Sequence, residues 1–249
     1  MTGPARPAYR LHQWLWIGID WLYPPQCGGC GRKGDRWCVD CRNKAQLIHP
    51  PICDRCGQTL QSGNLCINCR KSPPNFVALR SWAGFQGPVR SALHHLKYRR
   101  DIALGERLAE PLSDLYVAQG WPVDLVTPVP LGIARLKERG YNQAALIARP
   151  LALACGLRYE SHAIERTRET RSQVGLSLTE RKINVSDAFK AKSALVSGNN
   201  VLLVDDVATS SATLDACSGA LKKAGAAQVY CLTLARAIYL HTQNSDHRE

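Results

Sequence analysis

The chain has 249 residues, with 32 Lys and Arg against 20 Asp and Glu, so its formal net charge is +12. Apolar residues make up 45% of the sequence, which is enough to fill a hydrophobic core and excludes a wholly disordered chain. No apolar run approaches the roughly 18 residues that span a bilayer, so we predict no transmembrane segment.

The basic residues are unevenly distributed along the chain. Residues 1–75 carry ten Lys and Arg against four Asp and Glu, whereas residues 191–249 carry five of each kind. A basic amino-terminal half favours a polyanionic partner, such as a nucleic acid or a polyphosphate. The alternative is ordinary surface charge that keeps the protein soluble.

Residues 1–24 are predicted to form an amino-terminal helix, because positions 9–24 read YRLHQWLWIGIDWLYP. This stretch is not expected to be a signal peptide, since Asp20 interrupts its short apolar run and no small-residue cleavage site follows. Two interpretations stay open. The helix either docks on its own protein or contacts a membrane surface through Trp14, Trp16 and Trp21.

Residues 25–72 form a cysteine-rich segment with four C-x-x-C pairs. Each pair can direct two thiolates at one metal ion, and two pairs complete a tetrahedral zinc site. A disulfide scaffold is the alternative, but adjacent pairs of this kind have poor geometry for disulfides. We therefore predict two structural zinc sites, with either a sequential or an interleaved grouping of ligands. In the simpler, sequential grouping the ligands are Cys27, Cys30, Cys38 and Cys41 for one site and Cys53, Cys56, Cys66 and Cys69 for the other.

After Pro73 and Pro74 the sequence alternates between strand and helix patterns. This alternation is typical of an α/β fold with a mainly parallel sheet. Pro150 is expected to kink or break one of the helices. Residues 165–182 are polar and Arg-rich, which predicts a mobile loop, and residues 241–249 are predicted to be a flexible tail. Strands are predicted at 76–85, 124–128, 201–204 and 228–235, and helices at 88–99, 103–118, 141–155 and 212–224.

The strongest chemical pattern is VLLVDDVATSSATL at 201–214, in which an apolar strand leads into two acidic residues, a loop of small residues and a helix. In an open α/β sheet, ligands bind at the carboxyl ends of the strands. Backbone N–H groups of residues 209–213 would face a phosphate at the amino end of the helix. Asp205 and Asp206 would bind sugar hydroxyls while Mg²⁺ offsets the negative charge. The alternative is a pair of aspartates that only caps the helix.

This pattern resembles the ribose-5-phosphate loop of type I phosphoribosyltransferases. The resemblance implies that Asp205 and Asp206 are the catalytic pair and contact the ribose hydroxyls of phosphoribosyl pyrophosphate. It also implies that the following loop wraps the 5-phosphate, with Ser211 where the family usually has Gly. The residues that would bind the phosphoribosyl ligand are Asp205, Asp206, Val207, Ala208, Thr209, Ser210, Ser211, Ala212 and Thr213.

Three further blocks extend the resemblance: HHLKYRRD at 94–101, PVPLGIARLKERGYNQA at 128–144 and RTRETRSQVGLSLTERKINVSDAF at 166–189. With the cysteine pairs before them, they make the chain similar to the ComF family of competence-associated proteins over roughly residues 10–240. The implied fold is a type I phosphoribosyltransferase-like α/β domain with a mainly parallel sheet and an amino-terminal double zinc-ribbon module. The implied divisions are a helix at 1–24, the double zinc ribbon at 25–72, the phosphoribosyltransferase-like domain at 73–240 and the tail at 241–249.

Basic and polar residues of these blocks are candidates for binding pyrophosphate or for covering the site. Cations behind the strand at 124–128 would bind the pyrophosphate. By resemblance, the loop at 165–182 would close over the site and exclude water from a cationic sugar transition state. These pyrophosphate and lid candidates are Lys97, Arg135, Arg139, Asn142, Gln143, Arg166, Arg168 and Gln173.

The ComF resemblance implies a protein that binds phosphoribosyl pyrophosphate with Mg²⁺, and also single-stranded DNA, in support of DNA uptake during natural transformation. Its implied partners include proteins of the DNA-uptake machinery, and its implied location is the cytoplasm or the cytoplasmic face of the membrane. The alternative is an active phosphoribosyltransferase of nucleotide metabolism, with an amine or a base as acceptor. A third interpretation is a zinc-ribbon scaffold whose ligand site is inactive.

Overall fold

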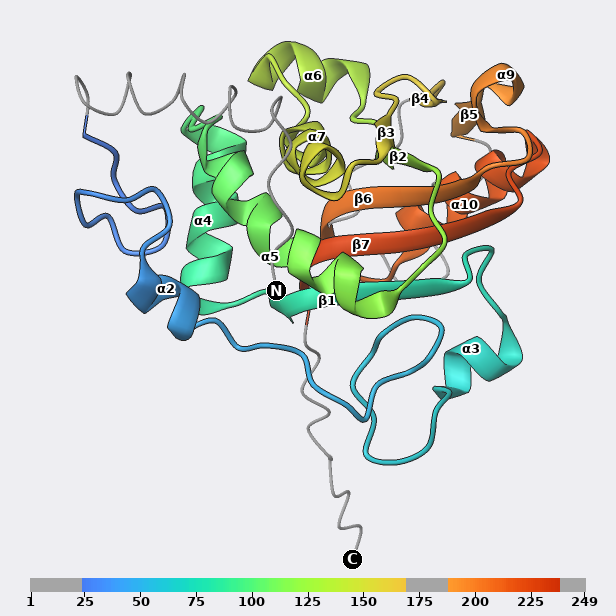
Figure 1. Ribbon diagram of the computed structural model, residues 1–249, viewed down its shortest axis with the longest axis horizontal. Coiled ribbons are helices and arrows are strands. Elements are labelled where there is room, and N and C mark those ends of the chain that lie inside the picture. The colour runs from blue at the N-terminus through green and yellow to red at the C-terminus, as the bar shows by residue number, and fades with distance from the viewer. Residues whose placement is uncertain (1–23, 169–187, 238–249) are drawn as a thin grey trace, which may run out of the picture.

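The computed structural model describes residues 24–168 and 188–237, which contain a five-stranded parallel sheet in the order β1-β7-β6-β2-β3 (Figure 1). Every neighbouring pair in this sheet runs parallel, as the alternation of strands and helices predicted. The strands are β1 (Ala78–Gly84), β2 (Leu125–Pro128), β3 (Arg158–Tyr159), β6 (Asn200–Ala208) and β7 (Gln228–Arg236).

Helices cover both faces of the sheet, so its strands are buried on each side (Figure 1). Helices α4, α5 and α7 pack on one face, and α10 packs on the other. A short antiparallel pair, β4 with β5, lies beside α10. The helices are α2 (Val39–Asn43), α3 (Ile67–Lys71), α4 (Gly87–Tyr98), α5 (Leu104–Gln119), α6 (Ile133–Arg139), α7 (Gln143–Cys155), α9 (Ser193–Val196) and α10 (Ala212–Lys223). The short strands are β4 (Ile164–Arg166) and β5 (Phe189–Ala191).

Two hydrophobic clusters, one on each face, form the core. Successive residues of a strand point to opposite faces, so Leu202 and Val204 of β6 enter the cluster beneath α4, α5 and α7. Val201 and Leu203 enter the cluster beneath α10. This alternation continues beyond the apolar run and determines which way the acidic pair faces.

Strand β6 is longer than the predicted 201–204. It runs from Asn200 to Ala208, and its parallel register with β7 pairs Asp205 with Thr233 and Ala208 with Arg236. The apolar pattern and the pairing with β2 both end at Val204, but the strand continues because β7 offers it backbone partners as far as Arg236. Both aspartates therefore belong to the strand and not to the loop after it.

Helix α7 runs unbroken through Pro150, so of the predicted kink or break at this residue the break was wrong. A proline inside a helix leaves the carbonyl four residues earlier without its backbone partner. Here that carbonyl belongs to Leu146 and faces Gly105 of α5, where an added Cβ would lie 2.7 Å from the Leu146 oxygen. The missing side chain at Gly105 leaves room for the close approach of α5, and packing between the two helices maintains α7.

Several predicted segments lie outside the described residues. They are the amino-terminal helix, most of the loop at 165–182 with Gln173, and the tail at 241–249. The start of that loop is β4, which pairs with β5. In the described part of the chain, no helix is both long and apolar enough to cross a bilayer.

The segment between the two cysteine clusters runs along the outer edge of the sheet. The Ile48 N–H donates to the Trp82 carbonyl at 3.2 Å, and the Gly84 N–H donates to the Gln46 carbonyl at 2.8 Å. Leu47 forms an antiparallel bridge with Ala83. The exposed edge of β1 is thereby paired, which removes a template for unwanted strand pairing.

Candidate functional site

The eight clustered cysteines form two sets of four, grouped in sequential order. Within each set, all four sulfur atoms lie within 4.8 Å of one another. This spacing fits a tetrahedral zinc centre with four thiolate ligands. The sets, called here the first and second zinc centres, are Cys27, Cys30, Cys38 and Cys41, and Cys53, Cys56, Cys66 and Cys69.

The two centres share a local design that favours thiolates. In the first centre, the Cys38 N–H donates to the Cys27 sulfur at 3.4 Å. In the second, the Cys66 N–H donates to the Cys53 sulfur, also at 3.4 Å. Burial opposes ionisation of both accepting thiols, but these and other backbone N–H groups lower the pKa of Cys27 and of Cys53 to about 7. Each centre thus has a thiol that ionises readily, as metal binding requires.

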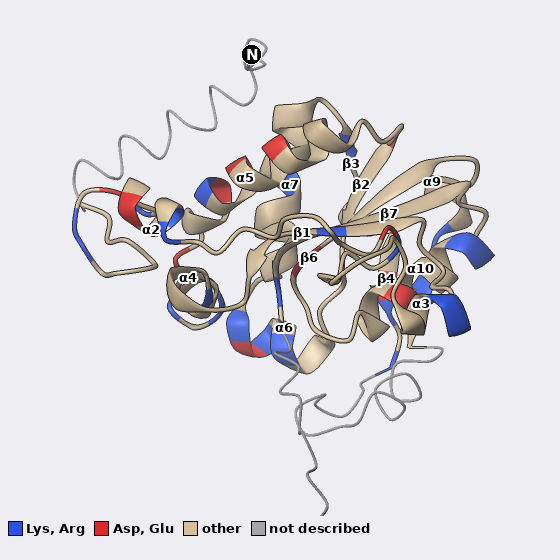
Figure 2. Ribbon diagram, turned by 90° about the horizontal axis from the view of Figure 1, so that it is seen from below, with Lys and Arg blue, Asp and Glu red and all other residues tan. Residues whose placement is uncertain are grey.

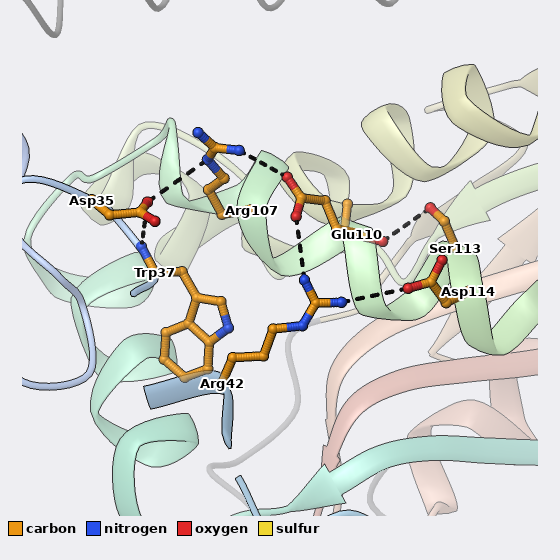
Figure 3. Close-up of polar contacts among 8 residues, drawn as sticks. Asp35, Trp37, Arg42, Arg107, Glu110, Ser113 and Asp114 are labelled. Atoms are coloured by element: carbon orange, nitrogen blue, oxygen red, sulfur yellow. Dashed lines mark hydrogen bonds and ion pairs between the residues drawn. The ribbon is translucent and has the colours of Figure 1, made fainter. Parts of the chain in front are cut away.

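The first zinc centre is attached to helices α4 and α5 mainly through side chains. Arg36 forms an ion pair of 2.8 Å with Asp101, just after α4, and both side chains are less than one-fifth exposed. A chain of weaker ion pairs continues along α5 (Figure 3). Trp37 and Cys41 also enter the hydrophobic cluster of this face. The residues of the α5 chain are Asp35, Arg42, Arg107, Glu110 and Asp114.

The second zinc centre is attached to the sheet through backbone groups. The Leu79 N–H of β1 donates to the Arg55 carbonyl at 2.7 Å. The buried Arg236, at the end of β7, donates to the Cys56 carbonyl at 2.6 Å. Gly57 adopts a φ of +69°, and a Cβ there would lie 2.4 Å from the Leu79 oxygen. This centre therefore depends on a glycine both for backbone conformation and for space.

Asp206 lies near the carboxyl end of β6, on the face covered by α4 and α7. Its carboxylate forms an ion pair with Lys97 of α4, and the two side chains are 6% and 21% exposed. Gln143 of α7 donates a hydrogen bond of 3.2 Å to the other carboxylate oxygen. Burial alone would raise the pKa of Asp206, but the Lys97 charge and these hydrogen bonds outweigh it and lower the pKa. Asp206 is therefore a carboxylate held by two partners.

Asp205 alternates with Asp206 along the strand and so faces the side of the sheet that α10 covers. Its Oδ1 accepts a hydrogen bond of 2.9 Å from the Asp206 N–H. Burial and the neighbouring Asp206 charge raise the pKa of Asp205 well above its ordinary value. The two aspartates thus differ in environment, although they are adjacent in sequence.

The loop after β6 ends in a left-handed turn. Ser211 precedes the first residue of α10 and has φ 61° and ψ 8°, a conformation that non-glycine residues rarely adopt. Its hydroxyl is buried and makes no hydrogen bond to the described part of the chain. The Ser211 carbonyl accepts from the Asp215 N–H at 2.9 Å and so starts the helix. The backbone at Ser211 thus adopts the left-handed conformation that is typical of glycine.

The predicted pyrophosphate residues divide into two groups. Lys97, Arg139 and Gln143 converge on Asp206, because Arg139 donates to the Gln143 oxygen at 2.9 Å. Arg135 is instead exposed on α6. Asn142 caps α7, where its Oδ1 accepts from the Ala144 N–H and its Nδ2 donates to the Val129 carbonyl.

The predicted lid residues are only partly described. The Arg166 guanidinium lies over the Phe189 ring at 5.6 Å, and its Nε donates to the Arg168 carbonyl at 3.4 Å. Both arginines are thus placed beside the antiparallel pair of β4 and β5. Gln173 lies outside the described residues.

Two residues of the site region were not singled out by sequence reasoning. Tyr98 lies under the Arg139 guanidinium, 5.1 Å from ring centre to Cζ, and no local pattern signals this contact. Asp101 holds Arg36 of the cysteine-rich segment. Asp101 is part of the HHLKYRRD block, so its place in that block was the available signal.

Comparisons with known proteins agree with these features. A model described as "Double zinc ribbon domain" matches residues 18–70, and one described as "Phosphoribosyl transferase domain" matches residues 131–246. A protein named "DNA utilization protein YhgH" from Salmonella typhi is 34% identical over 189 residues, which cover 73% of this chain and 83% of that protein. The chain belongs to the ComF family. "Competence protein F" from Haemophilus influenzae is 30% identical, with 80% of this chain and 90% of that protein covered. "Competence protein ComFC" from Bacillus subtilis is 29% identical, with 83% of this chain and 86% of that protein covered.

Two solved structures are also similar to part of this ComF protein. Adenine phosphoribosyltransferase from Thermoanaerobacter pseudethanolicus is 16% identical, with a TM-score of 0.38 over 60% of this chain and 73% of that chain. The allosteric regulatory enzyme of purine biosynthesis is 25% identical, with a TM-score of 0.35 over 52% of this chain and 25% of that chain. The matched phosphoribosyl transferase model, the parallel sheet and the cysteine spacing together show that the ComF protein combines a phosphoribosyltransferase-like α/β sheet with two four-cysteine sites that fit zinc.

Proposed function

We propose that this ComF protein binds phosphoribosyl pyrophosphate, together with Mg²⁺, at the carboxyl end of β6. The observation that carries the proposal is the order of features there. Asp205 and Asp206 lie near the carboxyl end of the strand, a left-handed turn follows at Ser211, and the twelve-residue helix α10 begins at once. The first N–H groups of such a helix have no partner within the helix, and the helix dipole favours a phosphate at this end.

Each part of the ligand would meet a different element. The aspartates of β6 would bind the ribose hydroxyls, and the N–H groups of residues 209–213 would bind the 5-phosphate. Arg135 and Arg139 of α6 would bind the pyrophosphate, which Mg²⁺ would partly neutralise. Arg166, Arg168 and Gln173 would belong to the covering loop. With the ligand held in this way, pyrophosphate departure would need electrostatic stabilisation more than covalent chemistry.

A thermal shift experiment tests this binding. Phosphoribosyl pyrophosphate with Mg²⁺ should raise the melting temperature of the wild type, because a ligand at 100 times its Kd stabilises the native state by about 2.7 kcal/mol. The combined Asp205→Asn and Asp206→Asn variant should show no ligand-induced shift. An unshifted wild type would contradict the proposal and favour the inactive scaffold.

Catalysis is the second candidate, because the same site would serve an active phosphoribosyltransferase. Release of pyrophosphate that depends on an added amine or base would establish this activity. Binding without release for any acceptor would instead assign the ligand a regulatory or structural role.

The names of the relatives favour a role in handling DNA, and we propose single-stranded DNA as a further partner, in the cytoplasm and with proteins of the DNA-uptake machinery. One surface near the site has the required chemistry. Tyr98 at the end of α4 is 58% exposed, and Ile133 and Leu136 of α6 are 59% and 43% exposed. Basic residues gather along α6 (Figure 2). Aromatic and cationic groups together bind single strands through base stacking and phosphate contacts.

Salt dependence tests this surface. Replacement of Arg135 and Lys137 by Ala should reduce the slope of log K against log salt by about 0.7 for each phosphate that these cations neutralise. A matched variant with Ala at Lys222 and Lys223, at the far end of α10, should keep the wild-type slope. Equal slopes for all three proteins would exclude α6 as the strand-binding surface.

A further inference from the structure

Side chains from four elements contact one another in a closed ring that includes Asp206. Lys97 of α4 pairs with one carboxylate oxygen, and Gln143 of α7 donates to the other at 3.2 Å. Arg139 of α6 donates to the Gln143 oxygen at 2.9 Å. The Arg139 guanidinium also lies over the aromatic side chain of Tyr98. Tyr98 is next to Lys97 in the sequence, so this contact closes the ring of side chains.

The burial of these groups determines whether Lys97 is available to bind a ligand. The Asp206 side chain is 6% exposed, and the Asp206 backbone N–H donates to the Asp205 carboxyl, so the two acidic groups are close although they face opposite sides of the sheet. Two adjacent carboxylates cannot both stay charged in a buried place without a counter-charge. Among the described residues that contact Asp206, Lys97 is the one with a positive charge; Gln143 is neutral, and Arg139 acts one hydrogen bond further away. Lys97 is therefore engaged in the unliganded protein and is not a free contact for an anion.

We propose that Lys97 is a positioning residue that holds Asp206 as a fixed carboxylate before any ligand arrives. Gln143 sets the orientation of that carboxylate, and Arg139 fixes Gln143. Lys97 and Gln143 each take one lone pair of a carboxylate that has two on each oxygen, so that a sugar hydroxyl can donate to a carboxylate that needs no rearrangement. The role of the ring in ligand binding rests on the proposed function, but the hold of Lys97 on Asp206 does not.

A double-mutant cycle on the unliganded protein tests the hold directly. Lys97→Met should lower the melting temperature strongly in the wild type and little in the Asp206→Asn background, because the second background has no charge to neutralise. Arg99→Met removes the same charge from an exposed position at the end of the same helix, and it should cost equally little in both backgrounds. An equal cost of Lys97→Met in both backgrounds would overturn the proposal. If the Lys97→Met single variant does not fold, folding of the double variant Lys97→Met with Asp206→Asn supports the proposal. Lys97→Gln then replaces Lys97→Met in the cycle.

The pH profile of ligand binding separates positioning from mere structural support. Within the described part of the chain, the charged and titratable groups near Asp206 are Lys97, Asp205 and, behind Gln143, Arg139. Lys97→Met should weaken binding of phosphoribosyl pyrophosphate with Mg²⁺ by roughly tenfold to a hundredfold at pH 7, the value of a charge-assisted hydrogen bond. Binding should recover as the pH rises and Asp206 loses its proton, whereas Lys97→Arg should keep the flat wild-type profile.

The two proposals fail in different ways. Wild-type protein that binds no phosphoribosyl pyrophosphate would overturn the proposed function, and the unliganded cycle would still decide whether Lys97 holds Asp206. The positioning role alone would be overturned if the wild type binds phosphoribosyl pyrophosphate and Lys97→Met binds it equally well. It would also be overturned if Lys97→Met loses affinity by the same factor at every pH.

Discussion

Ser211 occupies the position at which type I phosphoribosyltransferases usually have glycine. Its φ of 61° costs an L-residue about 1–2 kcal/mol, part of which a glycine would regain. Ser211→Gly should therefore raise the free energy of unfolding by up to about 1 kcal/mol, because glycine also loses more backbone entropy on folding. It should also tighten phosphoribosyl pyrophosphate binding, since the turn no longer carries strain or a buried hydroxyl. Denaturant unfolding and calorimetry measure both effects. Ser210→Gly, which relieves no left-handed residue, is the control. Equal or weaker affinity of Ser211→Gly would contradict the prediction.

Asp205 is expected to lower the stability of the folded protein while it serves ligand binding. Its pKa is raised in the folded protein, so folding favours the protonated form. The stability this provides is present below the ordinary pKa of an aspartate and is lost as the pH rises through the raised value. Above the ordinary pKa of an aspartate, the unfolded chain gains from ionisation of Asp205 whereas the folded chain opposes it, so Asp205→Asn should be more stable than the wild type at pH 8, while it no longer binds the sugar. Unfolding midpoints from pH 4 to pH 8 should converge at the acid end. A difference that does not vary with pH would contradict the assignment.

Elements were predicted well where a periodic apolar pattern determines them, and poorly where a distant contact does. The strand at 228–235 and the helix at 212–224 match β7 and α10 closely. The extension of β6 to Ala208 depends on its pairing with β7, and the continuity of α7 through Pro150 depends on Gly105. Asp205, Asp206 and the loop were chosen as site candidates from local order, and their role stays a prediction. The pairing of Lys97 with Asp206 was not predicted, because the two residues are 109 positions apart and α4 carries no signal of its partner.

The contact between the second zinc ribbon and β1 can be measured with two glycines. Gly57 and Gly31 both have positive φ, at +69° and +76°, so a Cβ strains the backbone equally at each. A Cβ at Gly31 meets open space, whereas a Cβ at Gly57 would lie 2.4 Å from the Leu79 oxygen. Gly31→Ala should cost about 1 kcal/mol, and Gly57→Ala clearly more, because it must also move the ribbon away from the strand. Chemical denaturation measures both. Equal costs would mean that the ribbon can shift away from β1 without any decrease in stability.

At the scale of the whole molecule, the two zinc centres belong to the two sides of one core. Cys27 and Cys41 lie in the hydrophobic cluster beneath α4, α5 and α7, and the four cysteines of the second centre lie in the cluster beneath α10. The segment that joins them pairs with the edge of β1. Composition indicated a boundary at Pro73, which stays a prediction. Composition could not indicate that the segment before Pro73 completes the packing of the segment after it, because those contacts join distant parts of the chain.

Zinc removal should therefore destabilise the α/β sheet itself, and in two steps. Cys30 is exposed in the first centre, whereas all four cysteines of the second centre are buried and Arg236 holds its loop. A chelator should take the first zinc quickly, because Cys30 is exposed, and with little change in circular dichroism, because Trp37 in the hydrophobic cluster and the Arg36–Asp101 ion pair still hold that segment against α4 and α5. Loss of the second zinc should come later and lower the melting temperature of the whole domain, since the thiolates would face a buried cluster without their counter-charge. Zinc release followed with a colorimetric chelator, in parallel with thermal unfolding, distinguishes the steps. Cys30→Ser should abolish the fast step alone. Simultaneous release of both ions, or a sheet that melts unchanged without zinc, would show that the ribbons are independent of the core.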